Sequence, residues 1–152
     1  SVYQSIQQTI MTLRGQIKDT TSLQVLSKVE QRISELFSCL VHEHKEYDLL
    51  YKLYNDEIII SDSDKREFFS LCGEYGSSAP ERLGLTSVST AQDLIDKALE
   101  REKYWRKQVA LEPDPEEREW MNIILTSYSR LRHKLQLMKY QYEQSKAFLF
   151  NE

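Results

Sequence analysis

The sequence has few of the residues that interrupt helices. Its 152 residues include four glycines and three prolines, too few for the many tight turns of an all-β fold. Two cysteines are likewise too few for a disulfide framework. Cys39 and Cys72 lie in apolar runs, so we expect both to be reduced and packed as small hydrophobic side chains. Long, uninterrupted helices are therefore expected.

Long apolar runs are also missing. The aliphatic runs are short, as from Ile58 to Ile60, whereas a membrane-spanning helix needs roughly 20 apolar residues. No signal-peptide pattern opens the chain. We therefore expect an intracellular, cytoplasmic protein without a transmembrane segment. The chain begins at Ser1 rather than Met, and amphipathic segments reach nearly to both ends, as in a fragment of a longer protein.

Motifs for common chemistry are absent from the sequence as well. There is no glycine-rich phosphate loop, no Gly-x-Ser-x-Gly elbow and no Cys-x-x-Cys pair. On a helix, His42 and His44 point about 200° apart and cannot share a metal ion. His42 and Glu46 could, but two such residues are typical of a solvated surface pair. We expect no catalytic residues, no metal and no cofactor.

The sequence is rich in helical periodicity instead. Apolar residues recur every three or four positions from Val2 to Ile17 and predict a first helix. Thr20, Thr21 or Ser22 is then expected to cap a second helix over about residues 23–58. The near-heptad seam of this helix consists of Leu26, Val29, Ile33, Leu36, Leu40, Tyr47, Leu50 and Tyr54.

Two shorter helices are expected in the middle of the chain. The acidic cluster from Ser61 to Asp64 predicts the cap of a short third helix that contains Phe68. Residues 76–84 form the clearest loop. Ser89, followed three residues later by Gln92, fits a capping box and predicts a fourth helix that ends near residue 111.

The last helix has the strongest local signal. Asp114 is expected to be its cap, and Pro115 suits the first helical position. The helix should cover about residues 115–150. Its seam alternates steps of three and four through Met121, Ile124, Tyr128, Leu131, Leu135, Met138, Tyr142, Ser145 and Leu149.

Together these elements predict a single-domain, all-α protein. We expect an elongated helical bundle of four to five helices, with two long antiparallel helices (about 23–58 and 115–150) as its spine. The basic flanks of the last helix would then face an acidic stretch of the second helix, which contains Glu30, Glu35, Glu43 and Glu46.

The last helix also suggests a function. Beyond residue 131 its apolar stripe narrows to two residues per heptad with charges beside it, a pattern that is typical of helix–helix pairing. We predict a non-enzymatic protein–protein interaction or assembly module, such as a scaffold or adaptor, that self-associates or docks a partner through coiled-coil-like contacts. The predicted partner-binding seam is Leu131, Leu135, Met138, Tyr142 and Leu149.

Two alternatives stay open. The net charge of −4 disfavours nucleic acid as a partner, but a basic face on the last two helices could bind nucleic acid or an anionic membrane surface. That patch is Arg101, Arg106, Lys107, Arg132, Lys139 and Lys146.

The other alternative is a small helical enzyme, although ordinary ion pairs on a helix surface account for its candidate carboxylates. These are Glu100, Glu102, Glu116, Glu117 and Glu119.

Overall fold

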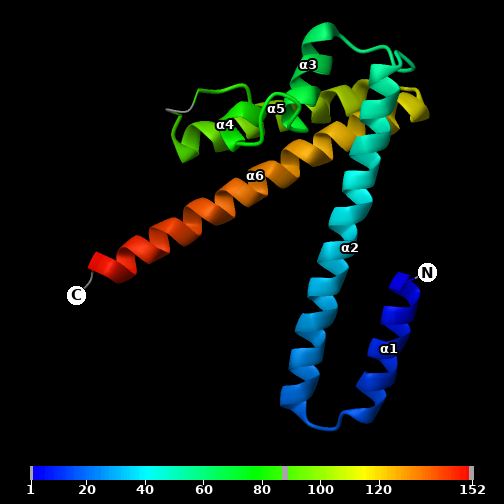
Figure 1. The fold of residues 1–152 in the computed structure, drawn as a ribbon, viewed down its shortest axis with the longest axis vertical. Coiled ribbons are helices and arrows are strands. Elements are labelled where there is room, and N and C mark those ends of the chain that lie inside the picture. Colours follow the sequence, from blue (N-terminus) through cyan, green and yellow to red (C-terminus); the bar gives the residue numbers. More distant parts are fainter. Residues whose placement is uncertain (1, 87–88, 151–152) are drawn as a thin grey trace. The chain divides into compact units, whose positions relative to one another are not determined.

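The computed structural model describes residues 2–86 and 89–150 of the chain, with residues 149 and 150 as backbone alone. Within these ranges the chain is all-α and has no β-strand, which confirms the predicted helical bundle. Its residue contacts divide the chain into two units, Ser1–Lys45 and Glu46–Glu152. The helices (Figure 1) are α1 (Val2–Gln16), α2 (Thr20–Tyr54), α3 (Asp62–Leu71), α4 (Ala79–Arg82), α5 (Ala91–Leu111) and α6 (Pro115–Phe150).

The first unit is a helical hairpin of α1 and most of α2, up to Lys45. The rings of Tyr3 and Phe37 have their centres 4.5 Å apart, and Arg14 forms an ion pair with Glu30. The apolar contact between the helices is limited, because two helices cover only part of each other's surface. Consequently, several large apolar side chains of this hairpin are exposed.

The start of α2 corrects one prediction. The Oδ2 atom of Asp19 accepts a 2.7 Å hydrogen bond from the backbone N–H of Ser22. Asp19 therefore does the capping that we assigned to Thr20, Thr21 or Ser22, and the helix begins at Thr20. The hydrogen bonds from Ser22 lower the pKa of the Asp19 carboxyl, because they stabilise its charged form.

The end of α2 also differs from the prediction, which placed it near Ile58. Asp56 has a φ of 54°, in the left-handed region that commonly ends a helix. The backbone N–H of Glu57 donates a 2.9 Å hydrogen bond to the carbonyl of Lys52. The helix therefore ends at Tyr54, and Ile58 lies beyond it, partly buried against the core of the second unit.

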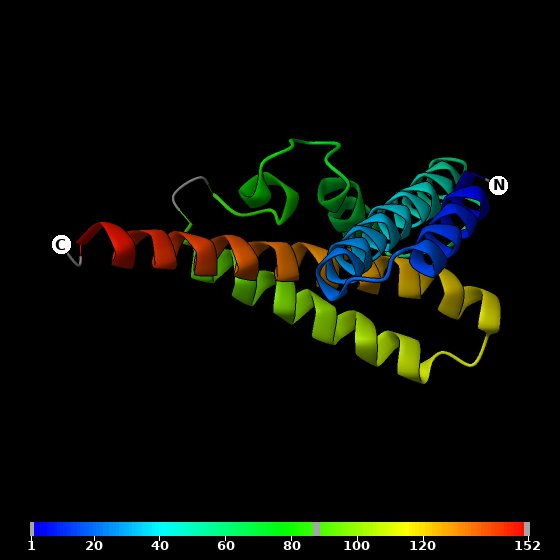
Figure 2. The ribbon, with the colours of Figure 1, turned by 90° about the horizontal axis from the view of Figure 1, so that it is seen from below.

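The second unit is built on the antiparallel pair α5 and α6, which lie side by side in both views (Figures 1 and 2). The helices α3 and α4 and the last turns of α2 complete its core. The pairing of α2 with α6 as a spine stays a prediction. The buried core side chains are Leu49, Leu53, Phe68, Phe69, Leu71, Leu83, Leu94, Ile95, Ala98, Trp105, Trp120, Ile124, Tyr128, Leu131 and Leu135.

Capping residues confirm the predicted starts of α3 and α6. At α3, the hydroxyl oxygen of Ser61 accepts a 3.1 Å hydrogen bond from the backbone N–H of Asp64. At α6, the Oδ1 atom of Asp114 accepts a 2.8 Å hydrogen bond from the backbone N–H of Glu116. Pro115 takes the first helical position, where its missing N–H has no intrahelical partner to lose.

The N-cap of α5 lies one residue after the predicted cap. Thr90 rather than Ser89 is the N-cap, and its side chain accepts a hydrogen bond from the backbone N–H of Asp93. The Oδ2 atom of Asp93 in turn accepts a 2.7 Å hydrogen bond from the backbone N–H of Thr90. The reciprocal box therefore uses Asp93, and the predicted box of Ser89 and Gln92 is wrong.

The predicted loop at residues 76–84 contains the short helix α4. Ser78 and Glu81 form a capping box at its start. The carboxylate of Glu81 approaches Gly76 so closely that a Cβ atom there would overlap with it, and Gly76 has a φ of 151°. This position therefore requires glycine.

Among the described residues, no helix combines the length and apolar character that a membrane span requires.

Candidate functional site

The predicted seam of α6 divides into a buried and an exposed part. Leu131 and Leu135 are each 7% exposed and belong to the core of the second unit. Their assignment to a partner-binding surface is therefore wrong, because α5 and its neighbours already cover them. Met138 and Tyr142 are 56% and 61% exposed. The side chain of Leu149 lies outside the described residues.

The seam becomes exposed where its neighbour α5 begins. The Nζ atom of Lys139 donates a 2.7 Å hydrogen bond to Oε1 of Gln92, in the first turn of α5. Because the two helices are antiparallel, α6 continues past this point without α5 (Figure 2). We call residues 137–150 the distal α6 segment. Besides the seam residues, its exposed apolar side chains are Leu137, Tyr140 and Phe148.

The predicted basic patch is not a continuous surface. Arg101 and Arg132 have only 12% and 16% of their side chains exposed, and both form ion pairs inside the second unit. The prediction of one basic patch is therefore corrected, because Arg101 and Arg132 form ion pairs within the second unit. Of its other members, Lys139 is half-buried, and Arg106, Lys107 and Lys146 are exposed.

Arg101 lies at the centre of a polar cluster between α3 and α5. Its Nη2 atom donates a 2.7 Å hydrogen bond to Oδ1 of Asp64, and its Nε atom lies 2.5 Å from Oε2 of Glu67. The Nε–H group is not aimed at that oxygen well enough for a hydrogen bond, so the contact is an ion pair. The guanidinium carbon stacks 4.3 Å from the centre of the Tyr104 ring. This cluster connects α3 to α5.

Glu102 forms a second cluster between α5 and α6. Its carboxylate accepts a 2.6 Å hydrogen bond from Nε of Arg132 and a 2.8 Å hydrogen bond from Nη2 of Arg106. The bond from Arg132 is the main cause that lowers the pKa of Glu102. Arg132 and Lys139 therefore face α5, which corrects our expectation that the basic flank of α6 faces the acids of α2.

The pair of His42 and Glu46 also differs from its prediction. His42 is buried, so its interpretation with Glu46 as a solvated surface pair is wrong. The Oε1 atom of Glu46 accepts a 2.5 Å hydrogen bond from the hydroxyl of Ser127 on α6. Within the part of the chain that the structure describes, no group of three or more His, Cys, Asp or Glu residues could hold a metal ion.

The partly buried Cys72 and the buried Tyr128 of the second unit are both held in their neutral forms. Burial raises the pKa of the Cys72 thiol to about 12, and burial also raises the pKa of the Tyr128 hydroxyl. Each charged form would lose its hydration in the core. A neutral thiol is a weak nucleophile, so this environment lowers the reactivity of Cys72.

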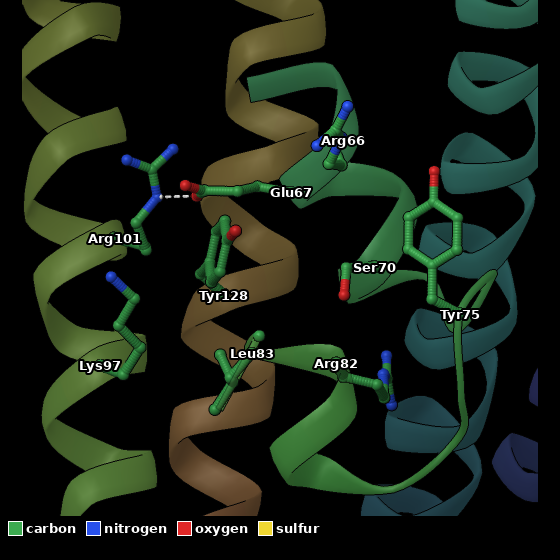
Figure 3. A pocket seen from close by; sticks show the side chains of 10 residues that line it. Arg66, Glu67, Ser70, Tyr75, Arg82, Leu83, Lys97, Arg101 and Tyr128 are labelled. Atoms are coloured by element: carbon green, nitrogen blue, oxygen red, sulfur yellow. Dashed lines mark ion pairs between the residues drawn. The ribbon is translucent and has the colours of Figure 1, made fainter. Parts of the chain in front are cut away.

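A pocket of about 320 Å³ lies in the second unit, and sequence reasoning missed it (Figure 3). Of the predicted site residues, only Arg101 lines it. Periodicity could not reveal this pocket, because its walls come from four helices that meet only in the folded chain. The lining residues are Arg66, Glu67, Ser70, Tyr75, Arg82, Leu83, Gly84, Lys97, Arg101 and Tyr128.

Comparison of the chain with models of protein families, with curated proteins and with solved structures finds no match. Its function is therefore inferred from its own surfaces.

Proposed function

We propose that this chain is a non-enzymatic protein–protein interaction or assembly module that pairs its distal α6 segment with a helix of a partner or of a second copy. The exposure of Met138 and Tyr142 carries this proposal. The two residues are four positions apart and therefore lie on one face of α6. They continue the stripe of Leu131 and Leu135, which already packs against a helix inside the chain.

The uncovered end of α6 supports the same function. The part of α6 beyond Lys139 extends past the first turn of α5, and most helical stability in proteins comes from the packing of an apolar face. It is also apolar on more than one side, because Tyr140 and Phe148 are exposed as well. A partner helix would bury this surface and stabilise the last turns of α6 through tertiary contacts.

Charged side chains border the stripe, as they do in paired helices. Lys139 and Glu143 form an ion pair with 3.7 Å between nitrogen and oxygen. The ammonium group of Lys146 lies 4.9 Å from the centre of the Tyr142 ring. Charges beside an apolar stripe fix the orientation and the choice of the partner helix.

The first unit offers a second apolar stripe, on α2. Val25, Val29, Leu36 and Leu40 are all exposed, and their spacing places them on one face of the helix. Val29, Leu36 and Leu40 belong to the near-heptad seam predicted for α2, and Val25 lies beside it. This stripe supports the same kind of function, because α1 leaves it uncovered within the hairpin.

Binding of nucleic acid or anionic lipid has less support. Arg101 and Arg132 are committed to carboxylates of the second unit. The other basic residues of the predicted patch are single side chains, some of them paired with acids. A binding surface for a phosphate backbone would need a larger group of free cations.

Charge substitutions in the distal α6 segment test the proposal. We expect Tyr142→Glu to abolish a mass above that of the monomer in light scattering, or to abolish capture of a partner by the purified chain, because a buried carboxylate is strongly disfavoured at such a contact. Gln144→Glu is the matched control, since it adds the same charge at an exposed position on another face of the same helix. A folded Tyr142→Glu variant with unchanged assembly and unchanged partner capture would contradict the proposal.

A further inference from the structure

The pocket of the second unit is large enough to admit a small molecule. Figure 3 shows Lys97 and Arg101 on the α5 side, Tyr128 of α6 in the middle, and Leu83 and Arg82 on the α4 side. Its volume of about 320 Å³ is at the lower end of the range for ligand sites, about 300–1,000 Å³. A ligand for this pocket must therefore be small.

Basic side chains dominate the lining of this pocket. Arg66, Arg82, Lys97 and Arg101 are basic, and Glu67 is the acid among the lining residues. Arg101 is balanced by its two carboxylate partners on α3. The other three basic groups give the pocket a positive potential, and like charges around one cavity repel each other until an anion enters.

These three groups keep donors for a ligand. The Nε atom of Arg82 donates a 2.6 Å hydrogen bond to the carbonyl of Leu71. The two terminal nitrogens of Arg82 remain as donors for a ligand. The Nζ atom of Lys97 lies 3.1 Å from Oε1 of Glu100, in a surface pair with an exposed acid, and such pairs are weak. Among the residues that the structure describes, no carboxylate forms an ion pair with Arg66 or Arg82.

An anion with a planar or apolar body fits this lining. Guanidinium groups match the oxygens of phosphate through paired donors, and an ammonium group adds a mobile point charge. Leu83 and the rings of Tyr75 and Tyr128 provide apolar contact beside these cations. We propose that the pocket binds a small phosphomonoester, with its phosphate held by basic side chains of the lining (Arg66, Arg82 and Lys97) and its body against the tyrosine rings. This site is separate from the helix-pairing surface.

Calorimetric titration of the purified chain at low ionic strength tests the proposal with three probes: phenyl phosphate, inorganic phosphate and phenol. Phenyl phosphate should bind most tightly, inorganic phosphate more weakly, and phenol not measurably. No binding of phenyl phosphate would overturn the proposal. Equal affinity for inorganic phosphate would overturn it too, because the tyrosine rings would then contribute nothing.

Two variants locate the site. Lys97→Gln and Arg66→Gln should each weaken the binding of phenyl phosphate about tenfold or more, the loss expected for one charge-assisted hydrogen bond. Lys107→Gln is the matched control, because Lys107 is exposed on the same helix as Lys97 and does not line the pocket. It should leave the affinity unchanged. Equal weakening by Lys107→Gln would show that the probe responds only to the overall charge and would overturn the proposal.

Discussion

The ion pair of Glu102 and Arg132 gives the sharpest prediction about stability. The Glu102 side chain is 6% exposed and that of Arg132 16% exposed, so both charges are largely removed from water. Glu102→Gln keeps the shape of the side chain and removes its charge. The guanidinium of Arg132 then stays in the α5–α6 contact without a carboxylate partner.

The expected loss of stability follows from these contacts. Removal of one partner from a buried ion pair costs about 3–5 kcal/mol. Arg132 keeps a 2.9 Å hydrogen bond to Oε1 of Gln136 and some contact with water, which reduce this penalty. The pair of Glu102 with Arg106 adds little, because Arg106 is mostly exposed. We expect Glu102→Gln to lower the free energy of unfolding by about 2–4 kcal/mol.

Urea unfolding at pH 7, followed by circular dichroism, measures this loss. Glu100→Gln is the matched control on the same helix, since Glu100 is 65% exposed and forms only a surface pair with Lys97. Its loss should be about 0–1 kcal/mol. If Glu102→Gln were no more destabilising than Glu100→Gln, the reasoning about the buried pair would be refuted.

The pH dependence gives a second readout of the same pair. The folded state lowers the pKa of Glu102 from its ordinary value of 4.5. The carboxylate therefore contributes its stability fully above pH 4.5, and this contribution disappears as the pH falls through the folded-state pKa. The difference in unfolding free energy between the wild type and Glu102→Gln should accordingly be constant near neutral pH and shrink below about pH 4.5.

Two further predictions concern the core of the second unit. Ile124→Ala should lower the free energy of unfolding by about 2–5 kcal/mol in urea unfolding, because the side chain is fully buried and the substitution leaves a cavity. The control Leu137→Ala, at an exposed position of the same helix, should change it by about 0.5 kcal/mol or less. Equal effects of the two substitutions would contradict the burial of Ile124. The partly buried Cys72 thiol has its pKa raised to about 12. It should therefore react slowly with iodoacetamide at pH 8 in the native protein and readily in urea, as followed by mass spectrometry. Equally fast modification of Cys72 in the native protein would contradict the raised pKa.

Local signals in the sequence were sufficient for most helices. The start of α6 was predicted to the residue, because Asp114 and Pro115 act within one turn of the chain. The end of α2 was predicted too late, because the left-handed conformation of Asp56 leaves no trace in the apolar pattern. Periodicity shows that a helix has an apolar face, but it does not show at which residue the helix ends.

The surface could be predicted only in part. The stripe from Leu131 to Tyr142 is continuous in sequence, and its burial changes where α5 begins. That point depends on tertiary packing. Likewise, Arg101 looks like a surface cation until Asp64 and Glu67 fold against it. The pocket could not be predicted at all, because its cations come from different helices.

Photo-crosslinking from position 142 tests the central claim most directly. A photoreactive phenylalanine analogue replaces Tyr142 in one variant and Gln144 in another, and the products are mapped by mass spectrometry. The helix-pairing account predicts that position 142 crosslinks to apolar residues on one face of a helix, in a second copy or in a specific partner, and that position 144 does not. Absence of such a product at position 142, or equal products at both positions, would contradict it.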